Sequence, residues 1–542
     1  MKKYLLSIFT LILPILTFAQ QTTSEKIDIV FKDYTGWFVD AIFYEIPFTD
    51  TFQLPWVLIV LVGGALYFTF YFKFINFTGF RTAIDVVQDK YHDIEKHGAE
   101  NLYGESSSDE DEDIIETLND DETGADGEVS HFQALTAALS ATVGLGNIAG
   151  VAVALSIGGP GATFWMIVAG FLGMASKFAE CTLGVKYRDV GEDGTVYGGP
   201  MYYLKKGLAE KGYSRLGKVL AVVFAVFVIG GSFGGGNMFQ ANQAAAQFVK
   251  LAGIEGSNGG MYFGLVMAAI VAVVIIGGIK RIASVTEKIV PFMAGIYVLA
   301  SLIILGANYT HIGDAFMLIY EGAFSGLGIA GGLVGVMIQG IRRGAFSNEA
   351  GVGSAAIAHS AVRTIYPASE GIVALLEPFV DTVVICTMTA LVIIITNFDG
   401  QFMEYGVPIS EGVELTATAF DSVIPHFSIV LTIAVILFAF STMISWSYYG
   451  MQGWIYLFGK GKITDLVYKI LFLFFVVVGA SISLGAVIDF SDAMIFAMVV
   501  PNIIGVVLLT PVVKRELDKY MNAISKKDDA IEDGATDFTE HM

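Results

Sequence analysis

Apolar stretches recur along the chain, separated by short polar or glycine-containing segments. A helix of about 20 apolar residues is about 30 Å long, which matches the hydrocarbon core of a bilayer. The pattern therefore predicts eleven membrane-spanning helices, at residues 54–74, 133–157, 162–186, 217–248, 261–279, 283–306, 324–362, 371–397, 427–450, 466–488 and 491–512. The seventh of these is too long for one straight crossing and has polar residues in its middle.

The first residues have the pattern of a secretory signal peptide. The string MKKYLLSIFTLILPILTFAQQ has two lysines, a short apolar core and small residues before Gln20. This predicts a signal peptide over residues 1–19, cleaved after Ala19. We then expect residues 20–53 to be periplasmic and the span 54–74 to run inward.

The distribution of Lys and Arg between the loops supports this orientation. Basic residues gather in the loops after the first, third, fifth, seventh and ninth spans and after the last span, whereas the loop 397–427 has none. Cytoplasmic loops carry the excess of Lys and Arg. The linker 75–132 and the tail 513–542 are therefore predicted to be cytoplasmic, in a multi-pass protein of a bacterial inner membrane.

Composition agrees with a membrane protein, since 54% of the residues are hydrophobic and only 15% are charged. The net charge of −21 is local, because residues 105–128 hold twelve Asp and Glu and no Lys or Arg. That segment is typical of a disordered insert; a calcium loop is the alternative, but the EF-hand spacing is missing. Cys181 and Cys386 lie in apolar runs as buried thiols, and no patch typical of nucleic-acid binding is present.

The second span contains an unusual glycine-rich segment, SATVGLGNIAG at 140–150. Glycine and asparagine weaken a helix, and irregular backbone survives at membrane depth only where it is buried or lines a cavity. The segment therefore indicates a broken helix facing a ligand site. Close packing of helices through small residues is the alternative. A dinucleotide-binding loop is excluded by the spacing and by the membrane context.

The seventh span contains a second such segment, QGIRRGAFSNEAGVGSAAIAHS at 339–360, with a predicted break at Gly344–Gly351. Charged side chains inside a span point to function. Arg342, Arg343 and Glu349 are consistent either with a gate or with an internal Arg–Glu pair that holds the helices together.

The two breaks open two sets of five spans, at 133–306 and 307–512. Interrupted helices at matching places in two halves indicate an inverted-repeat transporter. We therefore predict an all-α polytopic membrane protein with a five-plus-five inverted-repeat core, discontinuous first and sixth core helices, and one extra N-terminal transmembrane helix. Half-helix N-termini would bind a carboxylate, and unwound carbonyls would bind a small cation.

Two further polar stretches fit that site. The fourth span carries Asn237, Gln240 and Gln243, whose amides suit a zwitterion or else bond neighbouring helices. The ninth span carries Ser441, Thr442 and Ser445, whose hydroxyls are cation ligands or else bond back to their own helix.

The strings GLGNIAGVAVALSIGGPGATFWMIVAGFLGMASKFAE, YGGPMYYL, GNMFQAN, RGAFSNEAGVGSA and FSTMISWSYYG occur in this order over residues 130–515. They resemble the signature blocks of the alanine/glycine:cation symporter family, also called sodium:alanine symporters. The resemblance implies symport of alanine or glycine with Na⁺, or sometimes H⁺, through a five-plus-five fold. One departure is Leu145, where the family usually has Thr between the two glycines.

The resemblance also implies roles for individual residues. The substrate carboxylate would meet backbone N–H groups near Leu145 and Gly146, in a pocket shaped by Asn147, Gln240, Phe346, Ser347 and Asn348. Na⁺ would be held by the carbonyls of Ser140 and Val143 and the hydroxyls of Ser441 and Thr442. An all-oxygen set suits a hard cation.

The sequence thus predicts a secondary active transporter that carries a small neutral amino acid, alanine or glycine, into the cell with Na⁺ as coupling ion and no organic cofactor. The alternatives are an H⁺-coupled carrier, a facilitator on the same fold and a substrate-sensing receptor. An intramembrane enzyme is disfavoured because no H-E-x-x-H motif occurs. His359, the one histidine placed inside a predicted span, is expected to be a packing residue and not a catalytic base.

Overall fold

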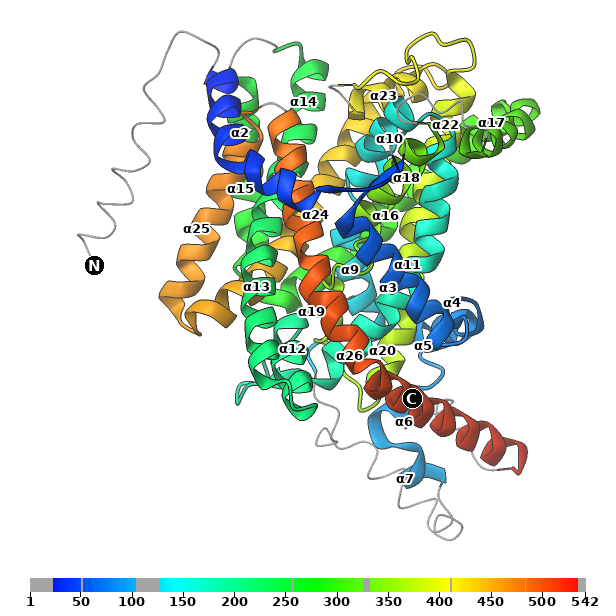
Figure 1. The fold of residues 1–542 in the computed structure, drawn as a ribbon, viewed down its shortest axis with the longest axis vertical. Helices are drawn as coiled ribbons and strands as arrows, with labels where there is room; N and C mark the ends of the chain where they lie inside the picture. The colour runs from blue at the N-terminus through cyan, green and yellow to red at the C-terminus, as the bar shows by residue number, and fades with distance from the viewer. Residues whose placement is uncertain are drawn as a thin grey trace.

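The computed structural model describes residues 23–49, 52–103, 127–254, 258–324, 332–409, 412–482 and 484–534. The predicted signal peptide and residues 105–126 of the acidic insert lie outside these ranges. The described chain is mostly helical, and its long helices run side by side along the long axis of the molecule (Figure 1).

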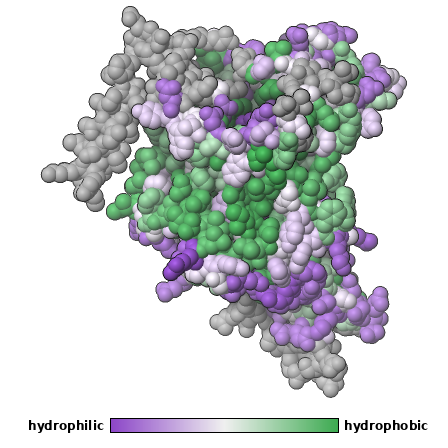
Figure 2. All heavy atoms as spheres, in the orientation of Figure 1, coloured by the Kyte–Doolittle hydropathy of each residue, from purple (hydrophilic) through white to green (hydrophobic). Residues whose placement is uncertain are grey.

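Within the described ranges, six helical segments are long and apolar enough to cross a membrane, and a bent pair makes a seventh. The six are Gly161–Lys186, Ser214–Ala252, Gly278–Ala307, Pro367–Thr396, Phe427–Phe458 and Val487–Glu532. Two shorter apolar helices, Trp56–Tyr71 and Gly259–Ile275, fall on predicted spans. Figure 2 shows the apolar side chains as a band across the middle of one face, with polar side chains below it. The protein is therefore a multi-pass membrane protein, while the total of eleven spans stays a prediction.

Most helices coincide with the predicted spans. The first two segments after the N-terminal region are α3 (Trp56–Tyr71) and the broken span formed by α9 (His131–Thr142), η2 (Gly146–Gly150) and α10 (Val151–Gly158). They are followed by α11 (Gly161–Lys186), α13 (Ser214–Phe233), η3 (Gly234–Met238), α14 (Phe239–Ala252), α15 (Gly259–Ile275), α16 (Gly278–Ala307), α18 (Gly332–Asn348) and α19 (Ala355–His359). The last ones are α20 (Pro367–Val373), α21 (Leu376–Pro378), η5 (Phe379–Cys386), α22 (Thr387–Thr396), α24 (Phe427–Phe458), α25 (Lys462–Gly479) and α26 (Leu484–Glu532).

Shorter elements connect these spans. They are α4 (Ile75–Thr78), α5 (Phe80–Val87), α6 (His92–His97), α7 (Ala99–Tyr103), α12 (Pro200–Glu210), η4 (Tyr309–His311), α17 (Ile312–Phe324) and α23 (Gly412–Asp421). A two-stranded antiparallel ribbon pairs β3 (Asp189–Val190) with β4 (Val196–Tyr197). Of the segments predicted to be cytoplasmic, α6, α7, α12 and the C-terminal part of α26 share the lower end of Figure 1.

The N-terminal region is more structured than its sequence predicted. Helix α2 (Thr23–Ile42) leads into a hairpin of β1 (Glu45–Thr49) and β2 (Phe52–Pro55) within the segment expected to be periplasmic. Aromatic contacts fasten it to the helical core, since the Phe38 ring lies against Phe227 and the Phe43 ring against Phe496. The segment is thus packed onto α13 and α26.

The first predicted break is present. Helix α9 starts at a capping box, in which Ser130 and Gln133 bond each other's backbone N–H. It ends at Thr142, and the chain bends by 50° before η2 and α10 continue. Residues Gly146–Gly150 form a turn of π-helix, which shifts the register of the backbone hydrogen bonds. Such π-bulges are frequent at functional sites.

The second break lies further along the chain than predicted. Helix α18 continues through Gly344 to Asn348, and the irregular stretch is Glu349–Ser354 instead of Gly344–Gly351. Gly344 serves close packing, because a Cβ atom there would be 3.3 Å from both Ala169 and Met166 of α11. The backbone turns at Gly351 and Gly353, whose φ angles of +85° and +91° favour glycine.

Candidate functional site

The two broken spans meet at Gly146 and the end of α18. A Cβ atom on Gly146 would lie 3.6 Å from Cδ1 of Phe346 and 3.6 Å from Cα of Ser347. The Phe346 ring is held in an edge-to-face contact with Phe239, at a centroid distance of 5.6 Å. Gly146 therefore faces one aromatic ring and the backbone of the second broken span.

The bend frees backbone groups that side chains then bind. The Leu145 N–H donates to Oε1 of Gln240 over 3.2 Å, and the Gly144 N–H donates to Oδ1 of Asn147 over 2.8 Å. Gln240 is itself oriented by donating from Nε2 to the Gly235 carbonyl. Leu145, Gly146, Asn147, Gln240, Phe346 and Ser347 are thus brought together as predicted neighbours.

Asp381 joins the two broken spans, and the sequence analysis missed it. Asn147 Nδ2 donates to Asp381 Oδ1 over 2.6 Å, and Ser347 Oγ donates to Asp381 Oδ2 over 2.8 Å. Asp381 is fully buried in η5. A carboxylate inside the predicted span 371–397 was the available signal, because such a residue is costly in a membrane.

Asn348, another residue predicted for the substrate pocket, bonds Thr382 and Ala350 instead of Asp381. Its Nδ2 donates to the Thr382 hydroxyl over 2.9 Å, and its Oδ1 accepts from the Ala350 N–H over 2.9 Å. The Thr382 hydroxyl in turn donates to Asp381. Asn348 therefore shapes the second break and reaches the other polar residues only through Thr382.

The four residues predicted for Na⁺ lie where α9 crosses α24. Ser140 Oγ donates to the Ser441 carbonyl over 2.7 Å, and the Thr442 hydroxyl donates to the Ser140 carbonyl over 3.0 Å. Val143 ends α9 beside Gly144, where a Cβ atom would come within 2.5 Å of the Thr442 hydroxyl. The Ser441 hydroxyl bonds back to the Phe438 carbonyl over 3.0 Å. The Ser140 carbonyl and the Thr442 hydroxyl thus lie close to each other, and Ser441 would need to turn its hydroxyl to join them.

The other amides of the fourth span bond neighbouring groups. Asn237 Nδ2 donates to the Phe472 carbonyl of α25 over 2.7 Å, and Gln243 Nε2 donates to the side chain of Asn242. Asn237 therefore follows the interhelical alternative, and only Gln240 reaches the first break.

The arginines of α18 pair with a residue that the sequence analysis did not name. Arg342 Nε donates to Asp492 Oδ2 over 2.9 Å, and Arg343 also bonds this carboxylate, which lies on α26. Glu349 instead accepts from Trp446 Nε1 over 3.0 Å and from the Ser354 hydroxyl. The internal Arg–Glu pair is therefore wrong, because the left-handed turn at Glu349 directs its side chain towards α24.

His359 is more than a packing residue. Its two ring nitrogens face carboxylate oxygens of Glu370 and Glu377, and all three residues are fully buried. Glu377 also accepts from Lys177 Nζ over 2.9 Å. The sequence analysis passed over Lys177 and Glu377, although both are charged residues within its predicted spans.

Comparison with known proteins decides the family. The sequence profile described as the sodium:alanine symporter family matches residues 112–533. The chain belongs to the sodium:alanine symporter family. It is 44% identical over 409 residues to the sodium/alanine symporter AgcS of Methanococcus maripaludis, covering 75% of this chain and 87% of that one. It is 37% identical over 392 residues to the putative sodium/proton-dependent alanine carrier protein YrbD of Bacillus subtilis, covering 70% and 78%.

A solved structure supports the fold of this symporter-family member. The chain resembles the crystal structure of MhsT in complex with L-phenylalanine, with a TM-score of 0.50 at 14% identity, over 74% of this chain and 100% of that one. At this identity the likeness concerns the fold alone. Family membership makes the protein a transporter, and the resemblance that the sequence predicted is confirmed.

Proposed function

We propose that the protein is a Na⁺-coupled symporter of small neutral amino acids, alanine or glycine. The observation that carries the proposal is the bend after Thr142, which leaves the Leu145 N–H facing the Gln240 amide at the point where the second broken span approaches. The relative AgcS is a sodium/alanine symporter by name, and its 44% identity to this chain supports the same substrate class.

The geometry fits a small zwitterion. The Gln240 Oε1 atom occupies the position that a substrate carboxylate oxygen would take on the Leu145 N–H. A freed N–H group at a helix break is a suitable anion ligand. Phe346 and the backbone of Ser347 stand on the opposite side, so the space left at Gly146 suits a hydrogen or methyl side chain. Asp381 positions Asn147 and Ser347 around that space.

The coupling ion would bind one helical turn away. Ser140 and Val143 supply carbonyl oxygens, and Thr442 supplies a hydroxyl that would turn its proton away from the ion. Oxygen ligands of this kind suit Na⁺ better than a transition metal. Because the carbonyls come from the same bend that carries the Leu145 N–H, an ion bound there would fix the backbone that receives the substrate.

We further propose the orientation given by the Lys and Arg distribution, with the mature N-terminus periplasmic and the C-terminus cytoplasmic, in a bacterial inner membrane. The two halves 133–306 and 307–512 would form the inverted repeats.

Uptake of labelled alanine into proteoliposomes tests the function. We expect accumulation driven by an imposed Na⁺ gradient and abolished when that gradient is dissipated. Accumulation driven by a pH gradient alone would identify an H⁺-coupled carrier. Equilibration without accumulation would identify a facilitator, and binding without uptake would identify a receptor.

A further inference from the structure

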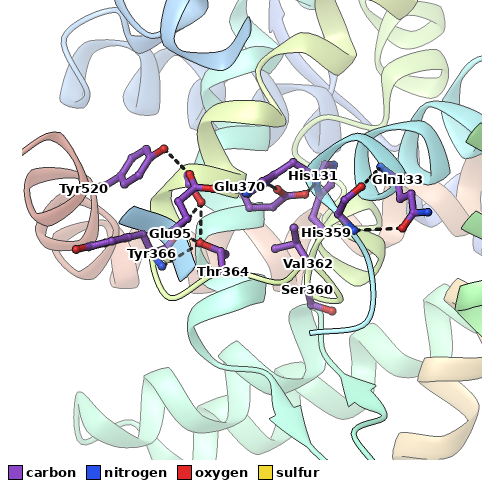
Figure 3. Close-up of polar contacts among 12 residues, drawn as sticks. Glu95, His131, Gln133, His359, Ser360, Val362, Thr364, Tyr366, Glu370 and Tyr520 are labelled. Carbon is purple, nitrogen blue, oxygen red and sulfur yellow. Dashed lines mark hydrogen bonds and ion pairs between the residues drawn. The ribbon is translucent and has the colours of Figure 1, made fainter. Parts of the chain in front are cut away.

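A chain of buried ionisable side chains crosses the predicted cytoplasmic end of the molecule, away from the proposed substrate and Na⁺ sites. Figure 3 shows His131, Glu370 and His359 pointing toward one another, with Glu95 and Tyr520 continuing the chain. His131 Nε2 lies 2.6 Å from Glu95 Oε2, and its Nδ1 contacts Glu370. His359 contacts Glu370 and Glu377 through its two ring nitrogens.

These contacts require more protons than neutral imidazoles bring. Each ring nitrogen faces a carboxylate oxygen, and such a contact is a hydrogen bond only if a proton lies between the two atoms. A neutral imidazole has one N–H, whereas imidazolium has two. The two histidines make four such contacts, so the cluster holds two protons beyond those of neutral rings and ionised carboxylates.

The balance of charge leads to the same count. Glu95, Glu370 and Glu377 are at most 3% exposed, and one cation, Lys177, lies against Glu377. Unbalanced buried charge is costly. Among these six residues, two imidazolium rings and Lys177 balance the three carboxylates, whereas neutral rings would leave two negative charges without a cation.

Other titratable and charged side chains surround this cluster. The Tyr520 hydroxyl of α26 donates to Glu95, and the Cys181 thiol of α11 is within 4.8 Å of the facing atoms of His359 and Glu377. Three further groups of charged residues lie beside this cluster. Glu180 and Glu349 lie near Lys177, and Asp93 of α6 pairs with Lys527. Glu287 accepts a hydrogen bond from Gln133 of α9.

The cluster connects segments that a transporter must move. His131 is the first residue of α9, the helix that leads to the bend at Val143–Leu145, and His359 ends α19, the short helix after the second break. Glu370 bonds both histidines, and Glu95 ties α9 to α6 and, through Tyr520, to α26. Opening the molecule at this end by moving α9 would separate His131 from its carboxylates.

We propose that His131 and His359 form a two-proton binding site that latches the cytoplasmic ends of the two broken spans, and that loss of these protons releases the latch. Without the protons, Glu95 and Glu370 face each other across a neutral ring and repel. By linkage, the latched form binds protons more tightly, so a rise in pH favours the released form.

Nitrogen NMR of histidine-labelled protein in lipid bilayers tests the proton site directly. The chain has seven histidines, and the signals lost in His131→Gln and His359→Gln identify the two rings. We expect both rings to be doubly protonated at about pH 7.5, above the usual pKa of histidine. Neutral rings at both positions would overturn the proposal.

Amide hydrogen exchange tests the latch. After correction for the intrinsic pH dependence, we expect exchange over residues 131–142 to rise about tenfold between about pH 7 and about pH 9, because local opening sets the rate. His131→Gln should exchange rapidly at both pH values, and the milder Tyr520→Phe should shift the response to lower pH. The control is Lys526→Gln. This variant breaks the exposed ion pair between Lys526 of α26 and Glu100 of α7, in which no histidine takes part.

A pH response that persists in His131→Gln, or that Lys526→Gln also removes, would refute the latch. Neither experiment measures transport. Their failure would therefore leave the proposed symport unaffected, and failure of alanine uptake would leave the proton site standing.

Discussion

The α-carbon of Ser347 lies 3.6 Å from the position that a Cβ atom would occupy on Gly146. The two broken spans, separated by about 200 residues of sequence, therefore touch through backbone. At this distance a methyl group makes ordinary van der Waals contact, whereas a branched side chain would fill the space proposed for the substrate.

We expect Gly146→Ala to insert and fold normally and to lower the affinity for alanine more than that for glycine. Gly146→Val should abolish uptake of both while leaving the amount of protein in the membrane unchanged, because the branched side chain would occupy the space proposed for the substrate without breaking a hydrogen bond. Competition of labelled glycine uptake by alanine measures the first effect. Normal alanine uptake by Gly146→Val would remove Gly146 from the site.

Substitution of the Thr442 hydroxyl gives the sharpest test of the proposed Na⁺ site. Thr442→Val preserves the shape of the side chain and removes the oxygen atom, so the Na⁺ concentration for half-maximal uptake should rise about tenfold or more, as loss of one ligand group predicts. Ser447→Ala is the control, since Ser447 is also a buried α24 hydroxyl but bonds the Ile444 carbonyl. An equal effect of both variants would argue against Na⁺ at Thr442.

Gly144 tests the same site from the other helix. A Cβ atom there would come within 2.5 Å of the Thr442 hydroxyl, and within 3.3 Å of Gln240 Oε1. Gly144→Ala should therefore push α9 and α24 apart and weaken Na⁺ dependence as well as alanine affinity. The double variant Gly144→Ala/Thr442→Ala removes the hydroxyl that the new Cβ atom would meet, so it should regain the thermal stability lost in Gly144→Ala while Na⁺-dependent uptake stays impaired.

Asp381 should act as a positioning residue. Asp381→Asn retains the size of the side chain but replaces an acceptor of the Asn147 and Ser347 hydrogen bonds by an amide group. We expect the KM for alanine to rise by about tenfold or more, because a hydrogen bond to a charged group contributes about 1.5–3 kcal/mol. The Na⁺ dependence should change much less, and a selective loss of Na⁺ dependence would contradict this assignment.

The ion pair of α18 with α26 should contribute to stability. Asp492 is fully buried and serves both Arg342 and Arg343, so Asp492→Asn leaves a buried positive charge without its partner. Such a change costs about 3–5 kcal/mol, which should be visible as a large drop in thermal stability in detergent. The more exposed pair Lys469–Asp465 gives the comparison, because Asp465→Asn should cost less than about 1 kcal/mol. Equal effects would show that Asp492 is not structurally special.

Much of the helical framework was accessible from hydrophobic patterning. The span predicted at 162–186 corresponds to α11 at Gly161–Lys186, and the glycines at 144–150 correctly marked a bend. Local composition predicts such features because it determines which segments are apolar enough to enter the membrane and where glycine weakens the helix. The resemblance then led to five residues that gather around Gly146 and to a crossing of α9 with α24 at Ser140 and Thr442.

The failures share one cause. Gly344 and Gly351 look alike in sequence, yet Gly344 packs against α11 and only Gly351 turns the chain. The partners of charged side chains were also missed, since Asp492 lies about 150 residues from Arg342 and Asp381 lies on a span that the patterning treated as simply apolar.

The sequence by itself determined that this chain crosses a membrane many times, that two spans are interrupted, and that it belongs with the sodium:alanine symporters. These properties depend on local hydrophobicity and on short motifs. Only the tertiary structure decided which buried side chains face one another, such as His131 with Glu95 and Glu370, and Arg343 with Asp492. A buried charge needs a partner in space, and nothing in the local pattern states which distant helix supplies it.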